Sequence, residues 1–155
     1  MAYVRLDKIK ADAHIESVVS TTDLRQGQFV ALGALQADGE AREATIAPAT
    51  EHVVMHCSVP LQYGNEREED FVLKAGKIGR AYVLEKGDII SVSEDLIDGA
   101  EVGTTFAPTG DGGTGAVWTA TGDGGTYSVE AELIDIETDV IVGNLYVLRV
   151  TKSEA

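Results

Sequence analysis

The chain has 155 residues, 44% of them hydrophobic, and a formal net charge of −14 from 26 acidic and 12 basic side chains. This length and composition suit one globular domain, and the acidic excess argues against binding to nucleic acid or anionic membranes, which requires Lys and Arg. A single cysteine, Cys57, excludes an internal disulfide, and no apolar run approaches the about 20 residues of a membrane-spanning helix. The first residues lack the apolar region of a signal peptide, so we expect synthesis in the cytoplasm.

Taken in chain order, residues 1–22 show no clear hydrophobic period, and we expect an N-terminal arm or edge strand there. Residues 23–155 are expected to form one β-rich domain, because short β-branched runs alternate with glycine-containing turns. The expected strands cover residues 29–35, 52–59, 88–93, 127–133 and 145–150. One short helix is expected over 65–76, which begins with acidic residues and ends with Lys-Gly.

Two of these strands are expected to differ in burial. Residues 29–35 are apolar on both faces, which is typical of a strand covered on both sides. Residues 127–133 alternate instead, so that one face meets a core and the face bearing Glu130 and Glu132 meets water.

Two short stretches recur within the chain. LRQGQFV at 24–30 resembles LEKGDII at 84–90, and each is expected to form a tight turn that leads into a strand. TGDGGT at 109–114 recurs at 121–126, and the two copies are expected to be turns on either side of a strand around Trp118.

The charges are unevenly distributed along the chain. Residues 1–86 have a net charge of −3, whereas residues 87–148 contain 12 acidic residues and no Lys or Arg. The first ten residues carry three basic side chains against one acidic one. We therefore expect a polar molecule, in which the N-terminal residues face a partner and the acidic half faces solvent.

His52, His56 and Cys57 could suggest a metal site or a nucleophile. The valines around them favour a strand, in which residues four apart are separated by about 13 Å. That separation is too large for one zinc ion held at about 2.0–2.1 Å by both imidazoles. We expect no metal site, a buried and inert Cys57, and a surface position for the isolated His14.

The acidic residues suggest two further kinds of site. Asp111 and Asp123 lie in glycine-rich loops, but each loop offers one carboxylate, so we expect plain turns rather than calcium sites. Glu130 and Glu132, with the acidic residues at 135–139, could suggest a glycosidase, which needs two facing carboxylates. Because they occupy the solvent face of an alternating strand, we expect a hydrated, edge-protecting surface instead.

Two stretches carry a resemblance to a known family. STTDLRQGQFVALG at 20–33 and AGKIGRAYVLEKGD at 75–88 together resemble small proteins of tailed phages that decorate or cement the capsid. The later Val102-Gly103-Thr104, with its glycine-rich hairpin, is similar to the second half of such proteins.

The resemblance implies a structural protein on the outside of the virion that is often a trimer and whose partner is the major capsid protein. It implies N-terminal arms that pair with capsid strands, so the expected partner-binding residues are Tyr3, Arg5, Lys8 and Lys10. No catalytic residue, metal ligand or cofactor is expected. The expected fold class is all-β, a small barrel or sandwich of β-tulip type with an N-terminal arm.

Two alternative functions remain open. A carbohydrate- or surface-binding module is suggested by the β-rich build together with exposed positions for Trp118 or Tyr127, whereas Trp118 could equally be a core or subunit-contact residue. A small hydrolase is suggested only by the paired carboxylates.

Overall fold

The computed structural model describes residues 3–9, 14–37, 39–47, 52–58, 72–99, 101–112, 116–121, 126–140 and 143–153. Over these residues the regular secondary structure is almost wholly β-strand, and the one helical element is a single 3-10 turn, η2 (Glu94–Leu96). The all-β fold expected from the sequence is therefore confirmed, and it includes a closed barrel.

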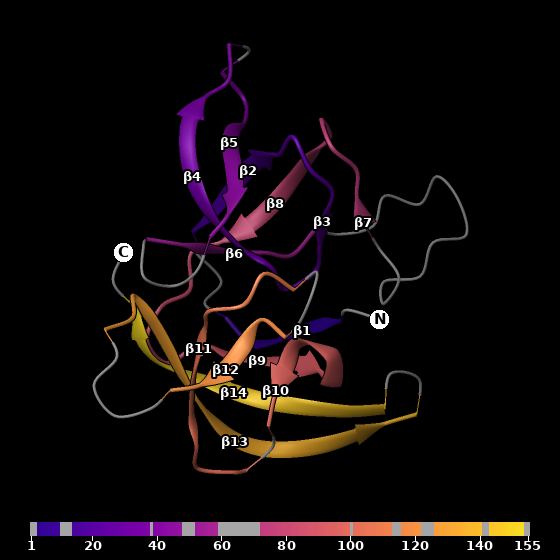
Figure 1. Ribbon diagram of the computed structural model, residues 1–155, viewed down its shortest axis with the longest axis vertical. Coiled ribbons are helices and arrows are strands. Elements are labelled where there is room, and N and C mark those ends of the chain that lie inside the picture. The colour runs from indigo at the N-terminus through magenta and orange to yellow at the C-terminus, as the bar shows by residue number, and fades with distance from the viewer. Residues whose placement is uncertain are drawn as a thin grey trace.

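The strands form two bodies stacked along the long axis of the molecule (Figure 1). The upper body is a closed barrel whose strands, in order, are β2 (Ile15–Val19), β5 (Arg42–Ile46), β4 (Phe29–Leu35), β6 (Val54–His56) and β8 (Ile78–Tyr82). The lower body is a seven-stranded sheet in the order β1 (Val4–Lys8), β9 (Ile89–Ser93), β14 (Gly143–Ser153), β13 (Val129–Asp139), β11 (Thr105–Pro108), β12 (Trp118–Ala120) and β10 (Ile97–Asp98). A two-stranded ribbon pairs β3 (Leu24–Arg25) with β7 (Val72–Leu73).

Each body has its own buried core, and three barrel strands belong to both. At the start of β4, along β6 and at the end of β8, side chains alternate between the barrel interior and the seven-stranded sheet. Phe29, Met55 and Tyr82 stand at paired positions and pack with the core of the sheet. Their neighbours pack inside the barrel with two leucines of the ribbon, and this inner core contains Val18, Leu24, Val30, Ala44, Val54, Leu73 and Ala81.

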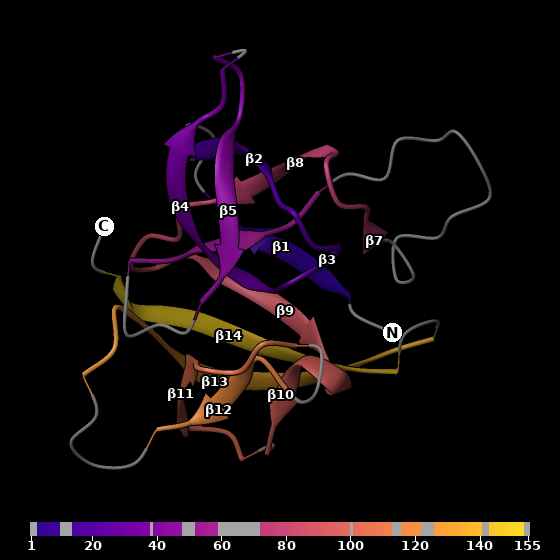
Figure 2. The same ribbon diagram turned by 45° about the horizontal axis from the view of Figure 1, so that its top comes forward.

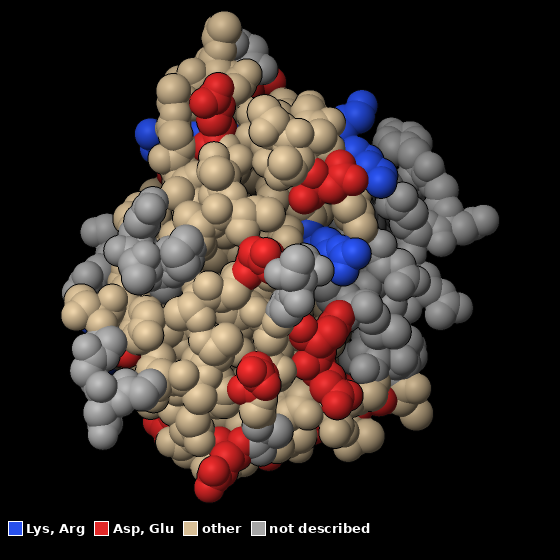
Figure 3. All heavy atoms as spheres, in the orientation of Figure 1, with Lys and Arg blue, Asp and Glu red and all other residues tan. Residues whose placement is uncertain are grey.

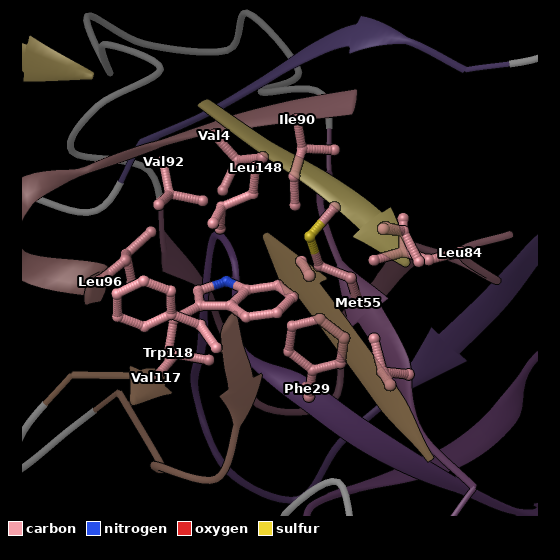
Figure 4. Close-up of a cluster of buried hydrophobic side chains, with 14 of the residues drawn as sticks. Val4, Phe29, Met55, Leu84, Ile90, Val92, Leu96, Val117, Trp118 and Leu148 are labelled. Atoms are coloured by element: carbon pink, nitrogen blue, oxygen red, sulfur yellow. The ribbon is translucent and has the colours of Figure 1, made fainter. Parts of the chain in front are cut away.

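Phe29 joins the barrel most directly to the sheet. Its ring meets the indole of Trp118 edge-on, with ring centroids 5.3 Å apart and planes at 89° (Figure 4). Both side chains are fully buried. Burying a large apolar side chain contributes about 1.5–3 kcal/mol, and an edge-to-face pair adds about 0.5–1.5 kcal/mol.

The expected strands are found, with different limits. Residues 29–35 form β4 as predicted, but only its first half is covered on both faces. Its second half projects in the β4–β5 hairpin at the top of the molecule, where Leu35 is 58% exposed (Figure 2). The alternation around Val129 is confirmed, although β13 continues to Asp139.

One prediction about local structure is wrong, and another holds for only part of its segment. Residues 72–73 of the expected helix form strand β7 and are followed by a turn, while 65–71 lie outside the described residues. The segment 1–22 is divided between two bodies, because β1 is an edge strand of the sheet whereas β2 lies between β5 and β8 in the barrel.

The resemblance between 24–30 and 84–90 reflects the same turn built twice. In each copy the glycine has a positive φ, +83° at Gly27 and +98° at Gly87. In each copy the residue after the glycine accepts a side-chain hydrogen bond from the first turn residue: Gln28 from the Arg25 N–H at 2.7 Å, and Asp88 from the Glu85 N–H at 2.8 Å. The backbone of Leu73-Lys74-Ala75-Gly76-Lys77 repeats the turn a third time.

Gly27→Ala should destabilise the protein far more than Gly87→Ala. A Cβ at either position pays the cost of a left-handed conformation, about 1–2 kcal/mol. At position 27 it would also lie 2.8 Å from Leu96 and 2.9 Å from Val4, whereas at position 87 nothing lies within 4 Å. Overpacking of this kind costs a further ~1–3 kcal/mol. Urea unfolding measures the difference, and equal losses in the two variants would show that position 27 is not packed between the two bodies.

Candidate functional site

Strand β1 carries the residues that were expected to bind a partner. It pairs antiparallel with β9, from Val4 opposite Val92 to Lys8 opposite Ile89, and forms one edge of the seven-stranded sheet. Val4 is only 3% exposed and packs in the core below the barrel. Residues 4–8 are therefore an integral part of the fold.

Arg5 is held by carboxylates of its own chain. Its guanidinium binds Asp7 on β1 and Glu137 on β13, the latter at 2.6 Å. It also donates to the hydroxyl of Ser91 at 3.3 Å, so that it reaches from the edge strand across the sheet. Hydrogen bonds to Asp7 and then Glu137 raise the pKa of Arg5 above its ordinary value. The charge of Arg5 is thus compensated within the sheet.

The other three expected contact residues differ from Arg5 and from one another. Tyr3 is half-buried, and its N–H donates to the Ser93 hydroxyl at 3.0 Å while its carbonyl accepts the Ser93 N–H at 3.0 Å. Lys8 is exposed at the end of β1. Lys10 lies outside the described residues. Of the four, Lys8 is the described cation that faces solvent without an ion pair.

The basic N-terminal residues do not form a separate end of the molecule. The basic N-terminal strand and the acidic strands belong to the same sheet, and Arg5 binds one of the acidic residues. The C-terminal strand supplies further compensation, because Glu130 stands opposite Lys152 and Glu132 opposite Arg149. A count of charges along the sequence does not reveal the ion pair of Arg5 with Glu137, because the order of strands in the sheet brings the two residues together.

A different group of cations faces solvent on the barrel. Arg25, Lys77 and Arg80 are exposed, and none has an ion-pair partner among the described residues. Lys74 lies beside them and binds Asp23 at 3.4 Å. On the face shown in Figure 3, Lys and Arg gather over the barrel near β3, β7 and β8, whereas most Asp and Glu lie over the sheet. The exposed positive charge of this face is therefore located on the barrel.

A buried polar cluster lies beneath this surface. The imidazole of His56, which is 0% exposed, donates from Nδ1 to the Arg25 carbonyl at 2.8 Å. Because a carbonyl only accepts, Nδ1 carries the proton. In the neutral ring Nε2 is then unprotonated, and it accepts from the Ser58 hydroxyl at 2.7 Å. The Ser58 oxygen in turn accepts the N–H of Arg80 at 3.0 Å. Burial lowers the pKa of His56, so the ring is neutral.

Two glutamines complete the cluster. Gln26 bonds both main-chain groups of Ser58, accepting its N–H at 2.8 Å and donating to its carbonyl. Gln28 accepts from Arg25 and donates to the Asp111 carbonyl at 2.7 Å. The cluster therefore fastens the first glycine turn to β6, β8 and the loop before β12. The available sequence signal for this buried cluster was the pair of glutamines between the apolar residues Leu24 and Phe29.

The Ser58–His56 pair has the order of groups found in a nucleophile and its base, but its surroundings fix it in place. Ser58 is 7% exposed, and its hydroxyl both donates to His56 and accepts from Arg80. Nucleophilic catalysis needs an attacking oxygen that a substrate can reach. The arrangement is suited to holding three elements together.

The remaining expectations about sites have these outcomes. Cys57 is buried and His14 is exposed, as expected. The described residues contain no group of three or more His, Cys, Asp or Glu side chains that could hold a metal ion. Asp111 is an exposed loop residue, and Asp123 lies outside the described residues. Within the described part of the chain, no helix is long and apolar enough to cross a membrane.

Among the residues that the structure describes, the aromatic side chains do not form an exposed platform. Trp118 is fully buried against Phe29, which corrects the hypothesis that it lies on the surface and confirms its place in the core. Tyr127 is half-buried at the edge of the same core. The case for a carbohydrate-binding surface loses its main residue.

The comparisons with known proteins do not identify a family. The sequence matches no family model and no curated protein.

His56 should make the protein less stable in mild acid. Its pKa is lowered in the fold, so the unfolded chain binds the proton more readily and stability rises with pH. The contribution is present above the ordinary histidine pKa of about 6.5 and is lost as the pH falls below it, with a limiting slope of about 1.4 kcal/mol per pH unit.

Urea unfolding of the wild type, His56→Gln and His14→Gln at pH 7.5 and 5.5 measures this effect. His56→Gln should be less stable at pH 7.5, by about 1–3 kcal/mol, because it breaks buried hydrogen bonds, yet it should lose less stability between the two pH values. His14→Gln, which removes an exposed imidazole bound to Glu16 at 2.8 Å, is the control for loss of a histidine outside the core. An unchanged pH dependence in His56→Gln would contradict this role for the ring.

Proposed function

We propose that this chain is a structural protein that binds the outer surface of an assembled phage capsid and stabilises it. The observation that carries the proposal is the place of the two stretches that resemble capsid decoration proteins. Strands β4 and β8, which come from 20–33 and 75–88, flank β6 on both sides. The two family-like stretches therefore lie on either side of one short strand of the barrel.

The construction of the molecule supports a binding role. Two packed β bodies share one layer of strands, and the largest buried side chains lie where the bodies meet. Such a framework keeps exposed side chains in fixed positions at little entropic cost on binding. The buried cluster around His56 adds hydrogen bonds across the same region.

Stabilisation of a capsid would follow from mass action. A protein that binds the assembled shell but not its separate subunits stabilises the shell by RT ln(1 + [L]/Kd) at every site, about 2.7 kcal/mol at a free concentration of 100 Kd. Because a shell repeats each site many times, a modest affinity is enough. The proposed partner is the major capsid protein, and the proposed place is the capsid exterior.

Of the N-terminal residues, Lys8 remains the proposed contact residue. Removal of residues 1–10 would be a poor test of this contact, because it would take Val4 out of the core and Arg5 out of its ion pairs. Lys8→Glu changes an exposed charge and leaves the strand in place. It therefore separates docking from folding.

Purified protein should bind expanded capsids that lack it and should raise the temperature at which they release DNA. Sedimentation with capsids measures binding, and a DNA-binding dye measures release. Protein unfolded in urea and diluted into the assay has the same charge and should not bind until it refolds, and Lys8→Glu should bind more weakly than the wild type. No saturable binding, with equal heat stability of capsids with and without the protein, would contradict the proposal.

A further inference from the structure

Five large hydrophobic side chains are exposed among the described residues: Ile15, Leu35, Ile78, Val102 and Val140. Two of these five are flanked by like charges that have no ion-pair partner among the described residues. The charges beside one are positive and those beside the other are negative. This opposition between two otherwise similar surfaces is the basis of the inference.

The first surface, here the cationic knob, lies at the start of β8. Ile78 is 51% exposed there, between the exposed side chains of Lys77 and Arg80. Across the strand pair, Val19 faces Ile78 and Ser17 faces Arg80, so neither partner supplies a negative charge. The ion pair of Asp23 with Lys74, at 3.4 Å, involves neither of these cations.

The second surface, here the acidic knob, is the connection between β10 and β11. Val102 is 55% exposed, the exposed Glu101 precedes it on the connection, and the exposed Asp98 is the last residue of β10. Gly103 continues the turn and bonds from its N–H to the Leu133 carbonyl at 2.8 Å, which fixes the connection to β13. The acidic knob is therefore an exposed valine on a connection anchored to the sheet, with two carboxylates before it in the chain.

The two knobs lie at opposite ends of the molecule. The turn before β8 is at the top of Figure 1, and the connection from β10 to β11 is at the bottom, with the long axis vertical; Figure 2 shows the same separation. One molecule cannot bring its own knobs together. Two copies arranged head to tail can.

We propose that copies of this chain associate head to tail, with the cationic knob of one copy against the acidic knob of the next. Ile78 would pack on Val102, while Lys77 and Arg80 would meet Asp98 and Glu101. A contact between two different surfaces is heterologous, and repetition closes a ring or extends a chain. The proposal stands without the capsid, because both surfaces belong to this protein.

The net charge of −14 opposes association, whereas the opposite charges of the two knobs favour it. Which effect is larger depends on the distances between the charges. At physiological salt the Debye length is about 8 Å, which screens repulsion between the bodies of two copies. Opposite charges in contact, about 4 Å apart, are screened much less. The contact is small, and we expect weak association that becomes strong only where many copies are held side by side.

Reversing the charge of either knob tests the proposal. The variant Lys77→Glu with Arg80→Glu places negative charge on both knobs, and the variant Asp98→Lys with Glu101→Lys places positive charge on both. In sedimentation equilibrium at 0.15 M salt, the average molecular mass of the wild type should rise with protein concentration. Each variant alone should stay monomeric under the same conditions. An equimolar mixture of the two variants should associate again, because each then meets a complementary knob.

A matched control distinguishes this contact from a general effect of charge. Arg42→Glu with Lys86→Glu also reverses two exposed basic side chains, and it changes the net charge by the same amount as the cationic-knob variant. The control should associate like the wild type. A wild type that stays monomeric up to about 1 mM, variants that still associate, or a mixture that remains monomeric would each overturn the proposal, whatever the outcome with capsids.

Discussion

The structure depends on one layer of three strands that is buried from both sides. Where β4, β6 and β8 meet the sheet, Val30, Val54 and Ala81 enter the barrel, while Phe29, Met55 and Tyr82 pack on the seven-stranded sheet. The contact of Phe29 with Trp118 lies at the centre of the second set. Because the same strands serve both cores, the barrel cannot lose its shape without exposing the core of the sheet.

This shared layer also explains the buried polar groups. The main-chain groups of Arg25 and Ser58 lie beside these cores, where hydrophobic packing alone would leave amides and carbonyls unpaired. His56, Ser58 and the two glutamines satisfy them and tie the glycine turn to the barrel. The exposed charges relevant to binding, on Lys77 and Arg80, stand on a strand fixed by these bonds.

Much of the fold could be predicted from local pattern, and little of the charge arrangement could. Apolar residues on both faces of 29–35 indicated a strand that is buried on both faces, which holds for its first half. Alternation around Val129 indicated a strand with one buried and one exposed face. The ion pair of Arg5 with Glu137 joins residues 132 positions apart, so no local pattern contains it. The burial of Trp118 and the pairing of His56 with Ser58 also depend on strand order, which sequence periodicity does not determine.

Unfolding in urea followed by two probes tests the shared layer most directly. Trp118 fluorescence reports on the core between barrel and sheet, and amide NMR signals of Val18 and Ala44 report on the barrel strands farther from it. If β4, β6 and β8 hold both cores together, the two probes should give one coincident transition. A barrel transition at lower urea, with Trp118 still buried, would contradict the account.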